Sequence, residues 1–158
     1  VNAIVSETGI VASYNHMGGK ICTLVAIEGG NDDAVKALAK DVAMHIAAAA
    51  PRYLNSSQVE AKELEQEKDI GRKRLLDEGK PEEMIEKILV GQINKFYKEV
   101  CLIDQIFIKD NSTNITKLLN QTSDKLSISS FMRFQLGEGV EKKESDFAAE
   151  VAAAAKGH

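Results

Sequence analysis

The sequence predicts an α+β fold: a three-stranded antiparallel sheet with packed helices, a projecting antiparallel helical hairpin and a C-terminal helical tail. Three short runs rich in strand-forming residues carry the sheet prediction, and they cover 10–15, 20–28 and 130–136. A heavily charged stretch, 57–100, has helical composition but is interrupted by Gly79 and Pro81. Glycine suits the left-handed position after a helix, and proline suits the first turn of the next, so two helices fold back on each other here.

The first two runs predict a β-hairpin. The turn between them is His16-Met17-Gly18-Gly19, whose glycines permit the positive φ angles of a tight turn. Neither side of 20–28 is very polar, which favours a central strand covered on both faces. His16 has two interpretations of equal weight at this point: an ordinary solvated turn residue, or a ring held out to contact another surface.

A helix is predicted over 33–50, with Asn31 or Asp32 as its cap and Pro51 as its stop. Its apolar stripe comprises Val35, Leu38, Val42, His45 or Ile46, and Ala49. Asp41 and His45 are four residues apart, but no third metal ligand follows at a credible spacing. We therefore expect His45 to pack against the sheet.

The two arms of the predicted helical hairpin differ in character. Ser57 and Glu60 match a capping box that would start the first arm. From 59 to 79 this arm carries seven acids and five bases, and its apolar seam is limited to Val59, Leu64, Ile70 and Leu75. Such an arm must project into solvent. The second arm is more apolar and should return the chain to the core, through Met84, Ile85, Ile88, Leu89, Phe96 and Val100.

Three further elements are predicted after the hairpin. A short helix is expected over 112–121. The run 130–136 alternates, and its apolar face is assigned to Met132, Phe134 and Leu136. Glycines at 137 and 139 then break the strand, and the segment 140–158 carries a short helix that must dock on something.

Composition excludes several classes of function. The net charge of −4 and the lack of a concentrated basic face argue against nucleic acid as a partner, and the lack of an 18-residue apolar run argues against a membrane span. Without a visible signal peptide we expect a cytoplasmic protein. The phosphate-loop motif is broken by Tyr14 and Ile21. No combination of nucleophile, base and orienting group recurs, so we expect no enzyme, no catalytic residue, no cofactor and no metal.

Read end to end, the chain resembles the C-terminal half of bacterial elongation factor Ts. The matching stretches occur in the order of the family: SYNH at 13–16, GKICTLV at 19–25, AMHIAA at 43–48, EGKP at 78–81, EKILVG at 86–91, KFYKEV at 95–100, FMRF at 131–134, GEG at 137–139 and SDFAAEV at 145–151. The resemblance implies a translation elongation factor that promotes GDP release from elongation factor Tu by protein contact, without covalent chemistry. The chain also begins without methionine, within a strand-like pattern, so we expect a fragment that lacks the N-terminal half.

The same resemblance implies a division of the chain. Residues 1–55 and 102–139 correspond to the C-terminal core subdomain, 56–101 to the coiled-coil arm that mediates dimerisation in some members, and 140–158 to a docking module. It also implies residues that contact Tu: His16, Met17, Gly18 and Gly19 at the hairpin tip, with Asp146, Phe147 and Val151 in the tail. The alternative is a structural dimerisation or interaction module without exchange activity, with the hairpin as the dimer contact.

Overall fold

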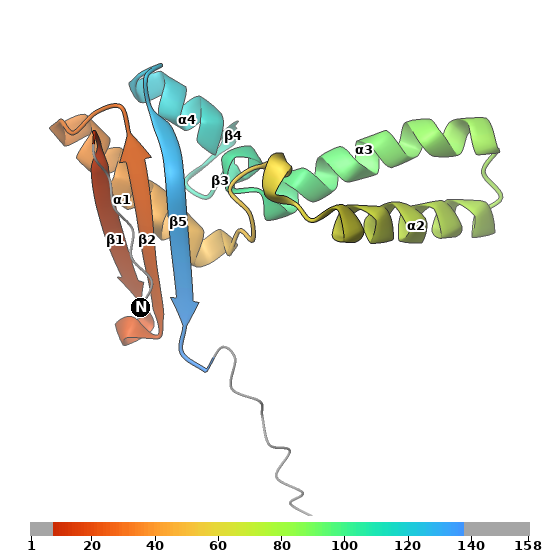
Figure 1. Ribbon diagram of the computed structural model, residues 1–158, viewed down its shortest axis with the longest axis horizontal. Helices are drawn as coiled ribbons and strands as arrows, with labels where there is room; N and C mark the ends of the chain where they lie inside the picture. Colours follow the sequence, from red (N-terminus) through yellow and green to blue (C-terminus); the bar gives the residue numbers. More distant parts are fainter. Residues whose placement is uncertain (1–7, 138–158) are drawn as a thin grey trace, which may run out of the picture.

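The computed structural model describes residues 8–137, which form a sheet-and-helix core and a long two-helix arm (Figure 1). The core sheet has three antiparallel strands in the order β1-β2-β5, namely β1 (Ile10–His16), β2 (Ile21–Glu28) and β5 (Ser127–Gln135). The predicted α+β class and antiparallel sheet are confirmed. The predicted tail helix at 140–158 lies outside the described residues.

One helix, α1 (Asp33–Ala49), packs on the sheet against β1 and β2. Asp32 caps it by accepting a hydrogen bond from the Val35 backbone N–H at 2.9 Å. On the central strand β2, Val25 and Ile27 are fully buried beneath α1 in the main hydrophobic cluster. Burial of the apolar side chains in this cluster is the main favourable contribution to the stability of the core, because removal of apolar area from water is the dominant favourable term in folding.

The apolar face that the alternation assigns to the third strand is not the face that packs against α1. Phe131 of β5 pairs with Val25 and packs against the core cluster, so the opposite side chains, Met132, Phe134 and Leu136, face away from α1. Phe134 is 46% exposed and Leu136 is 79% exposed. The alternation is real, but pairing with β2 decides which side of the strand is buried.

A small second sheet precedes α4 and was not predicted. The strands β3 (Ile106–Phe107) and β4 (Asp110–Asn114) pair antiparallel, after a short turn of 3-10 helix, η3 (Leu102–Asp104). The helix predicted over 112–121 begins later than expected, because α4 (Ile115–Thr122) is capped by Asn114, whose side chain accepts from the Lys117 N–H at 2.8 Å.

The arm consists of α2 (Ala61–Asp77) and α3 (Glu82–Val100), which run antiparallel away from the core (Figure 1). Gly79 has a φ of 72° between them, the left-handed conformation predicted for the turn. Pro81 lies immediately before α3 rather than inside its first turn. The predicted projecting hairpin is therefore present.

The apolar seam of α2 differs from the prediction at one position. Leu75 is buried against Ile85 and Leu89 of α3, but Ile70 is 63% exposed. Gly71 occupies the seam instead, and a side chain there would meet Leu89 and Gln92 at once. The two helices approach closely at this level because no Cβ separates them.

The predicted capping box is also wrong. Ser57 lies in a separate turn of 3-10 helix, η2 (Ser56–Gln58), where it donates to the side chain of Asn55. Glu60 is the residue that precedes α2, and its side chain makes no capping bond. A sequence match cannot show that the chain turns once more before the helix starts.

The two chain segments at the base of the arm are joined by backbone hydrogen bonds. Tyr53 donates to Val100 at 3.0 Å, and its carbonyl accepts from Leu102 at 2.9 Å, in a short parallel bridge. Glu63 of α2 accepts hydrogen bonds from the side chains of both Arg52 and Tyr53. The segment that enters the arm and the segment that leaves it are thus held side by side.

His45 was predicted to pack against the sheet. The buried ring also forms a hydrogen-bond network with the segment after the arm. Its Nε2 lies 2.9 Å from Gln105 Oε1, and its Nδ1 accepts from the Ile108 N–H at 3.3 Å. Gln105 Nε2 in turn donates to the carbonyls of Glu99 at 2.9 Å and Ala49 at 3.5 Å. Neutral His45 with a proton on Nε2 satisfies both ring contacts.

The close approach at Gly71 generates a prediction with a matched control on the facing helix. Gly91 of α3 has open space around it, so Gly91→Ala should raise the free energy of unfolding by about 0.5–1 kcal/mol through helix propensity. Gly71→Ala should give no such gain, because its Cβ would lie 2.8 Å from Leu89 Cδ2. Urea denaturation of both variants checks this. Equal stabilisation by the two changes would contradict the tight approach.

The His45 network predicts a pH dependence of stability. Burial lowers the pKa of His45 below its ordinary value of 6.5, and the hydrogen bond with Gln105 partly offsets this shift. Below pH 6.5 the unfolded chain therefore binds a proton that the folded chain does not, so stability falls as pH drops from 6.5 toward the lowered pKa. Urea denaturation between pH 5 and 7.5, at about half-unit steps, measures the slope. In His45→Gln, which cannot titrate, this part of the slope should vanish.

Candidate functional site

The tip of the β1–β2 hairpin is an exposed turn with an unusual backbone. Three consecutive residues of the short 3-10 turn η1 (Met17–Gly19) have positive φ: Met17 at 51°, Gly18 at 67° and Gly19 at 88°. The two glycines adopt these angles without strain, as predicted. Met17 adopts one despite its side chain, which is 62% exposed. The turn therefore presents an apolar side chain to solvent at the end of the sheet.

His16, immediately before the turn, is exposed and held by a neighbour on the same strand. The rings of Tyr14 and His16 stack with centroids 5.9 Å apart, and the Tyr14 hydroxyl lies 3.2 Å from His16 Nδ1. This contact occupies Nδ1 of an exposed ring. No carboxylate or thiol in the described part of the chain bonds to this ring, so the geometry suits a contact and not proton transfer.

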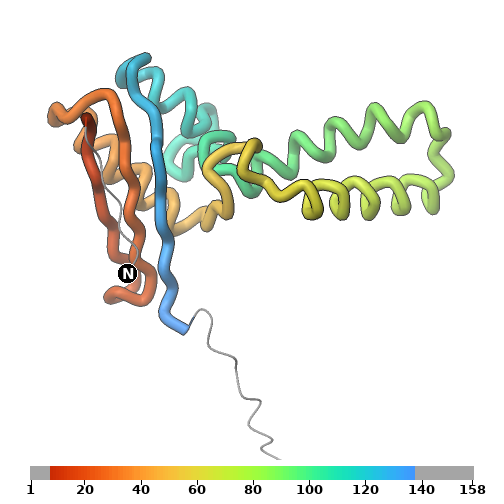
Figure 2. Tube along the Cα trace, viewed as in Figure 1, coloured from red at the N-terminus to blue at the C-terminus, as the bar shows by residue number. Residues whose placement is uncertain are grey.

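The end of β5 lies beside the turn, but its exposed apolar side chains are on the opposite face of the sheet from His16. The Leu136 N–H donates to the Lys20 carbonyl at 2.8 Å, which fixes Leu136 beside the turn. Phe134, two residues before Leu136, is paired with Cys22. Figure 2 shows the turn and the end of β5 at the same end of the sheet. We call His16, Met17, Gly18 and Gly19 the tip surface, and Phe134 and Leu136 lie next to it on the sheet face turned away from α1.

The sequence assigned all four residues of the tip surface to partner contact, and it did not identify the neighbouring exposed side chains of Phe134 and Leu136. The only sequence signal for the latter two is the alternation of β5, and that signal assigns them to a face without saying whether the face is buried. The other predicted contact residues, Asp146, Phe147 and Val151, lie outside the described residues. Among the described residues, the structure therefore brings together His16, Met17, Gly18 and Gly19 in one turn.

The rest of the described chain offers little for metal or covalent chemistry. Asp41 accepts from Lys109 Nζ at 2.7 Å. In residues 8–137 no group of three or more His, Cys, Asp or Glu side chains is placed to hold a metal ion. Cys101 is a free, buried thiol, and burial is the main cause that raises its pKa to about 11, which makes it a poor nucleophile. Across the same residues no helix has the length and apolar character needed to cross a membrane.

Comparison with known proteins gives a consistent result. The family model for elongation factor TS matches residues 1–138. The curated elongation factor Ts of Geobacter sulfurreducens is 52% identical to this chain, and the match covers 93% of this chain and 72% of that protein. The elongation factor Ts of Geobacter metallireducens is 48% identical, and the match covers 96% of this chain and 74% of that protein. The corresponding protein of Halothermothrix orenii is 48% identical, with 90% of this chain and 47% of that protein covered. The chain belongs to the elongation factor Ts family, whose members are translation elongation factors.

Proposed function

We propose that this chain promotes the release of GDP from elongation factor Tu by protein contact, in the bacterial cytoplasm. Family membership over nearly the whole chain is the observation that carries this proposal. The exposed tip surface is the described feature best suited to such a contact. A loop held by a paired scaffold is a common position for recognition residues.

The physical basis of exchange is thermodynamic linkage. A partner that binds nucleotide-free Tu more tightly than GDP-bound Tu must weaken GDP binding by the same coupling free energy. No covalent step, cofactor or metal held by this chain is required, so the proposed activity is not that of an enzyme. The chain needs only to bind nucleotide-free Tu more tightly than GDP-bound Tu.

The contact with Tu is proposed to involve two parts of the chain. His16 and Met17 would contact Tu from the hairpin tip, with Gly18 and Gly19 allowing a close backbone approach. Phe147 and Val151, with Asp146, would supply a second patch from the docking module at 140–158. In this division, 1–55 and 102–139 form the core subdomain, and 56–101 forms the coiled-coil arm.

A structural dimerisation module is the second candidate, and one observation on the arm favours it. Four large apolar side chains of the two helices are each more than half exposed, although the arm is otherwise highly charged: Ile70, Leu76, Met84 and Val90. Exposed apolar side chains mark an interaction site where they form a contiguous patch, and a dimer of arms requires these four to do so. A second copy of the arm would cover them in a homodimer.

The exchange proposal predicts a specific effect of the tip histidine. His16→Ala should slow the release of a fluorescent GDP from Tu by roughly threefold to tenfold, because one exposed contact contributes about 1 kcal/mol. The free energy of unfolding should change by less than about 0.5 kcal/mol, as for other surface substitutions. Stopped-flow fluorescence measures the rate, with Lys117→Ala on α4 as the exposed control. If His16→Ala exchanged GDP as fast as this control, His16 would be an ordinary solvated turn residue.

The dimer alternative makes a separate prediction. If the arm carries dimerisation, the unmodified chain should form concentration-dependent dimers in sedimentation velocity. Combining Ile70→Glu with Val90→Glu should then shift the chain to monomer, since charges would have to be buried at the contact. Lys117→Ala should leave the distribution unchanged. A chain that is monomeric at all concentrations would remove this alternative and leave the exchange proposal untouched.

A further inference from the structure

The outer edge of β5 carries backbone groups that no other described segment pairs with. β5 is an edge strand, bonded to β2 on one side only. The Leu136 N–H points inward to Lys20, and the direction of these groups alternates along an antiparallel strand. The N–H and C=O groups of Phe131, Arg133 and Gln135 therefore point outward. Within residues 8–137 no backbone hydrogen bond from a second strand reaches this edge.

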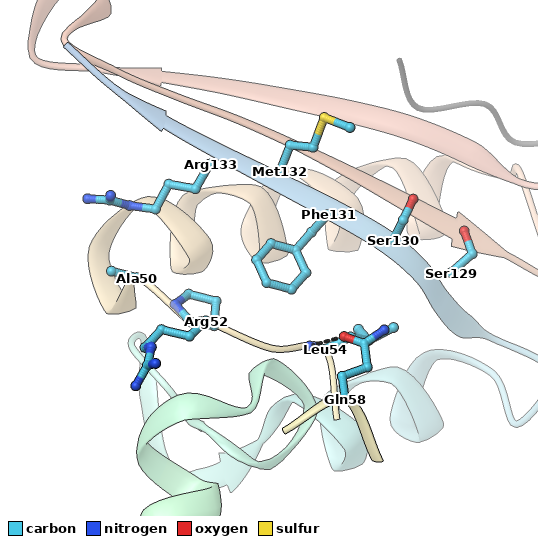
Figure 3. Close-up of a pocket in the computed structure, with 10 residues that line it drawn as sticks. Ala50, Arg52, Leu54, Gln58, Ser129, Ser130, Phe131, Met132 and Arg133 are labelled. Atoms are coloured by element: carbon cyan, nitrogen blue, oxygen red, sulfur yellow. Dashed lines mark hydrogen bonds between the residues drawn. The ribbon is translucent and has the colours of Figure 1, made fainter. Parts of the chain in front are cut away.

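A groove runs beside this edge. Its volume is about 510 Å³, with residues 129–133 of β5 along one side and the segment after α1, through Pro51 and Leu54, along the other (Figure 3). This second side is well anchored, because Pro51 and Leu54 are buried and the Leu54 carbonyl accepts from the Ile103 N–H. Figure 3 shows the Phe131 ring reaching from β5 toward that segment. The groove is thus built from fixed backbone on both sides.

The groove carries one arginine without a carboxylate partner, although the chain as a whole has a net charge of −4. Arg52 and Arg133 line it, and none of its lining residues is acidic. Arg52 is already paired with Glu63. Arg133 bonds only to neutral acceptors, the Ala47 carbonyl at 3.4 Å and Gln135 Oε1 at 3.1 Å. In the described part of the chain Arg133 has no carboxylate partner, so one guanidinium remains to pair with a carboxylate from elsewhere.

We propose that this groove binds an extended acidic segment of a partner protein, which adds to β5 as a fourth strand. Outward groups at two-residue spacing match the backbone of a strand, and main-chain bonds supply affinity in this mode of recognition. A carboxylate opposite Arg133 supplies selectivity through a charge-assisted bond. A single unpaired arginine is too little for a phosphate backbone, which needs several cations. The proposal concerns a surface apart from the tip and does not depend on nucleotide exchange.

Amide hydrogen exchange of the unmodified chain tests the free edge directly. By NMR, the outward amides of Phe131 and Arg133 should exchange faster than the inward amides of Met132 and Phe134 on the same strand. Addition of the peptide acetyl-Thr-Val-Asp-Val-Asp-Val-Thr-amide should slow the two outward amides by about tenfold or more at saturation. The two inward amides are the internal control and should change little. Outward amides that are already slow in the free chain would mean that the edge is occupied, and would overturn the proposal.

Peptide variants separate strand addition from simple charge attraction. A peptide N-methylated at its five central residues keeps both carboxylates but has no central N–H to donate, and should not bind. Replacing both Asp by Asn, or changing Arg133→Gln in the protein, should each weaken binding about tenfold in fluorescence anisotropy. Lys117→Ala is the matched protein control. No binding of the parent peptide, equal binding of the N-methylated peptide, or tighter binding of a thymidine decanucleotide would each overturn the proposal.

Discussion

The buried side chain of Gln105 is the contact on which the arrangement of core and arm depends. The chain leaves the core after α1, travels the length of the arm and returns before β3, so the two ends of this excursion must be brought together. Gln105 does this by binding His45 of α1 and the carbonyls of Ala49 and Glu99, at the carboxyl ends of α1 and α3. Buried amides with all partners satisfied are strongly directional, which fixes the geometry that apolar contacts alone would leave loose.

The parts of the fold that sequence predicts well are those set by local chemistry. Gly79 and Pro81 mark the arm turn, and Asp32 marks the start of α1, because each acts through its own backbone or its nearest neighbours. The parts that failed depend on distant partners. The buried side of β5 is set by β2, about 100 residues earlier in the chain. Gly71 replaces Ile70 in the arm seam because Leu89 and Gln92 of α3 lie opposite it. The apolar periodicity of α2 cannot show which residues of α3 it faces.

The candidate site shows the same division. The turn at the hairpin tip was predicted because positive φ angles favour glycine, whereas its role as a contact site came from the family resemblance and stays a prediction. Phe134 and Leu136 were missed because their exposure follows only from the register of β5 against β2. The groove beside β5 was also beyond sequence reasoning, since its two sides come from segments joined only in the folded chain. Surfaces made by one turn can be found from sequence, and surfaces made by two segments need the structure.

The parallel bridge between Tyr53 and Cys101 has a consequence for how the family can change over time. Because the arm departs from and returns to adjacent points, adding or removing whole helical turns at its far end leaves both anchoring points in place. Lengthening such an excursion adds only a slowly growing entropic penalty. Selection on the core therefore places little restriction on arm length. The arm is the segment in which insertions and deletions can accumulate while the sheet, α1 and the hairpin tip keep their relative positions.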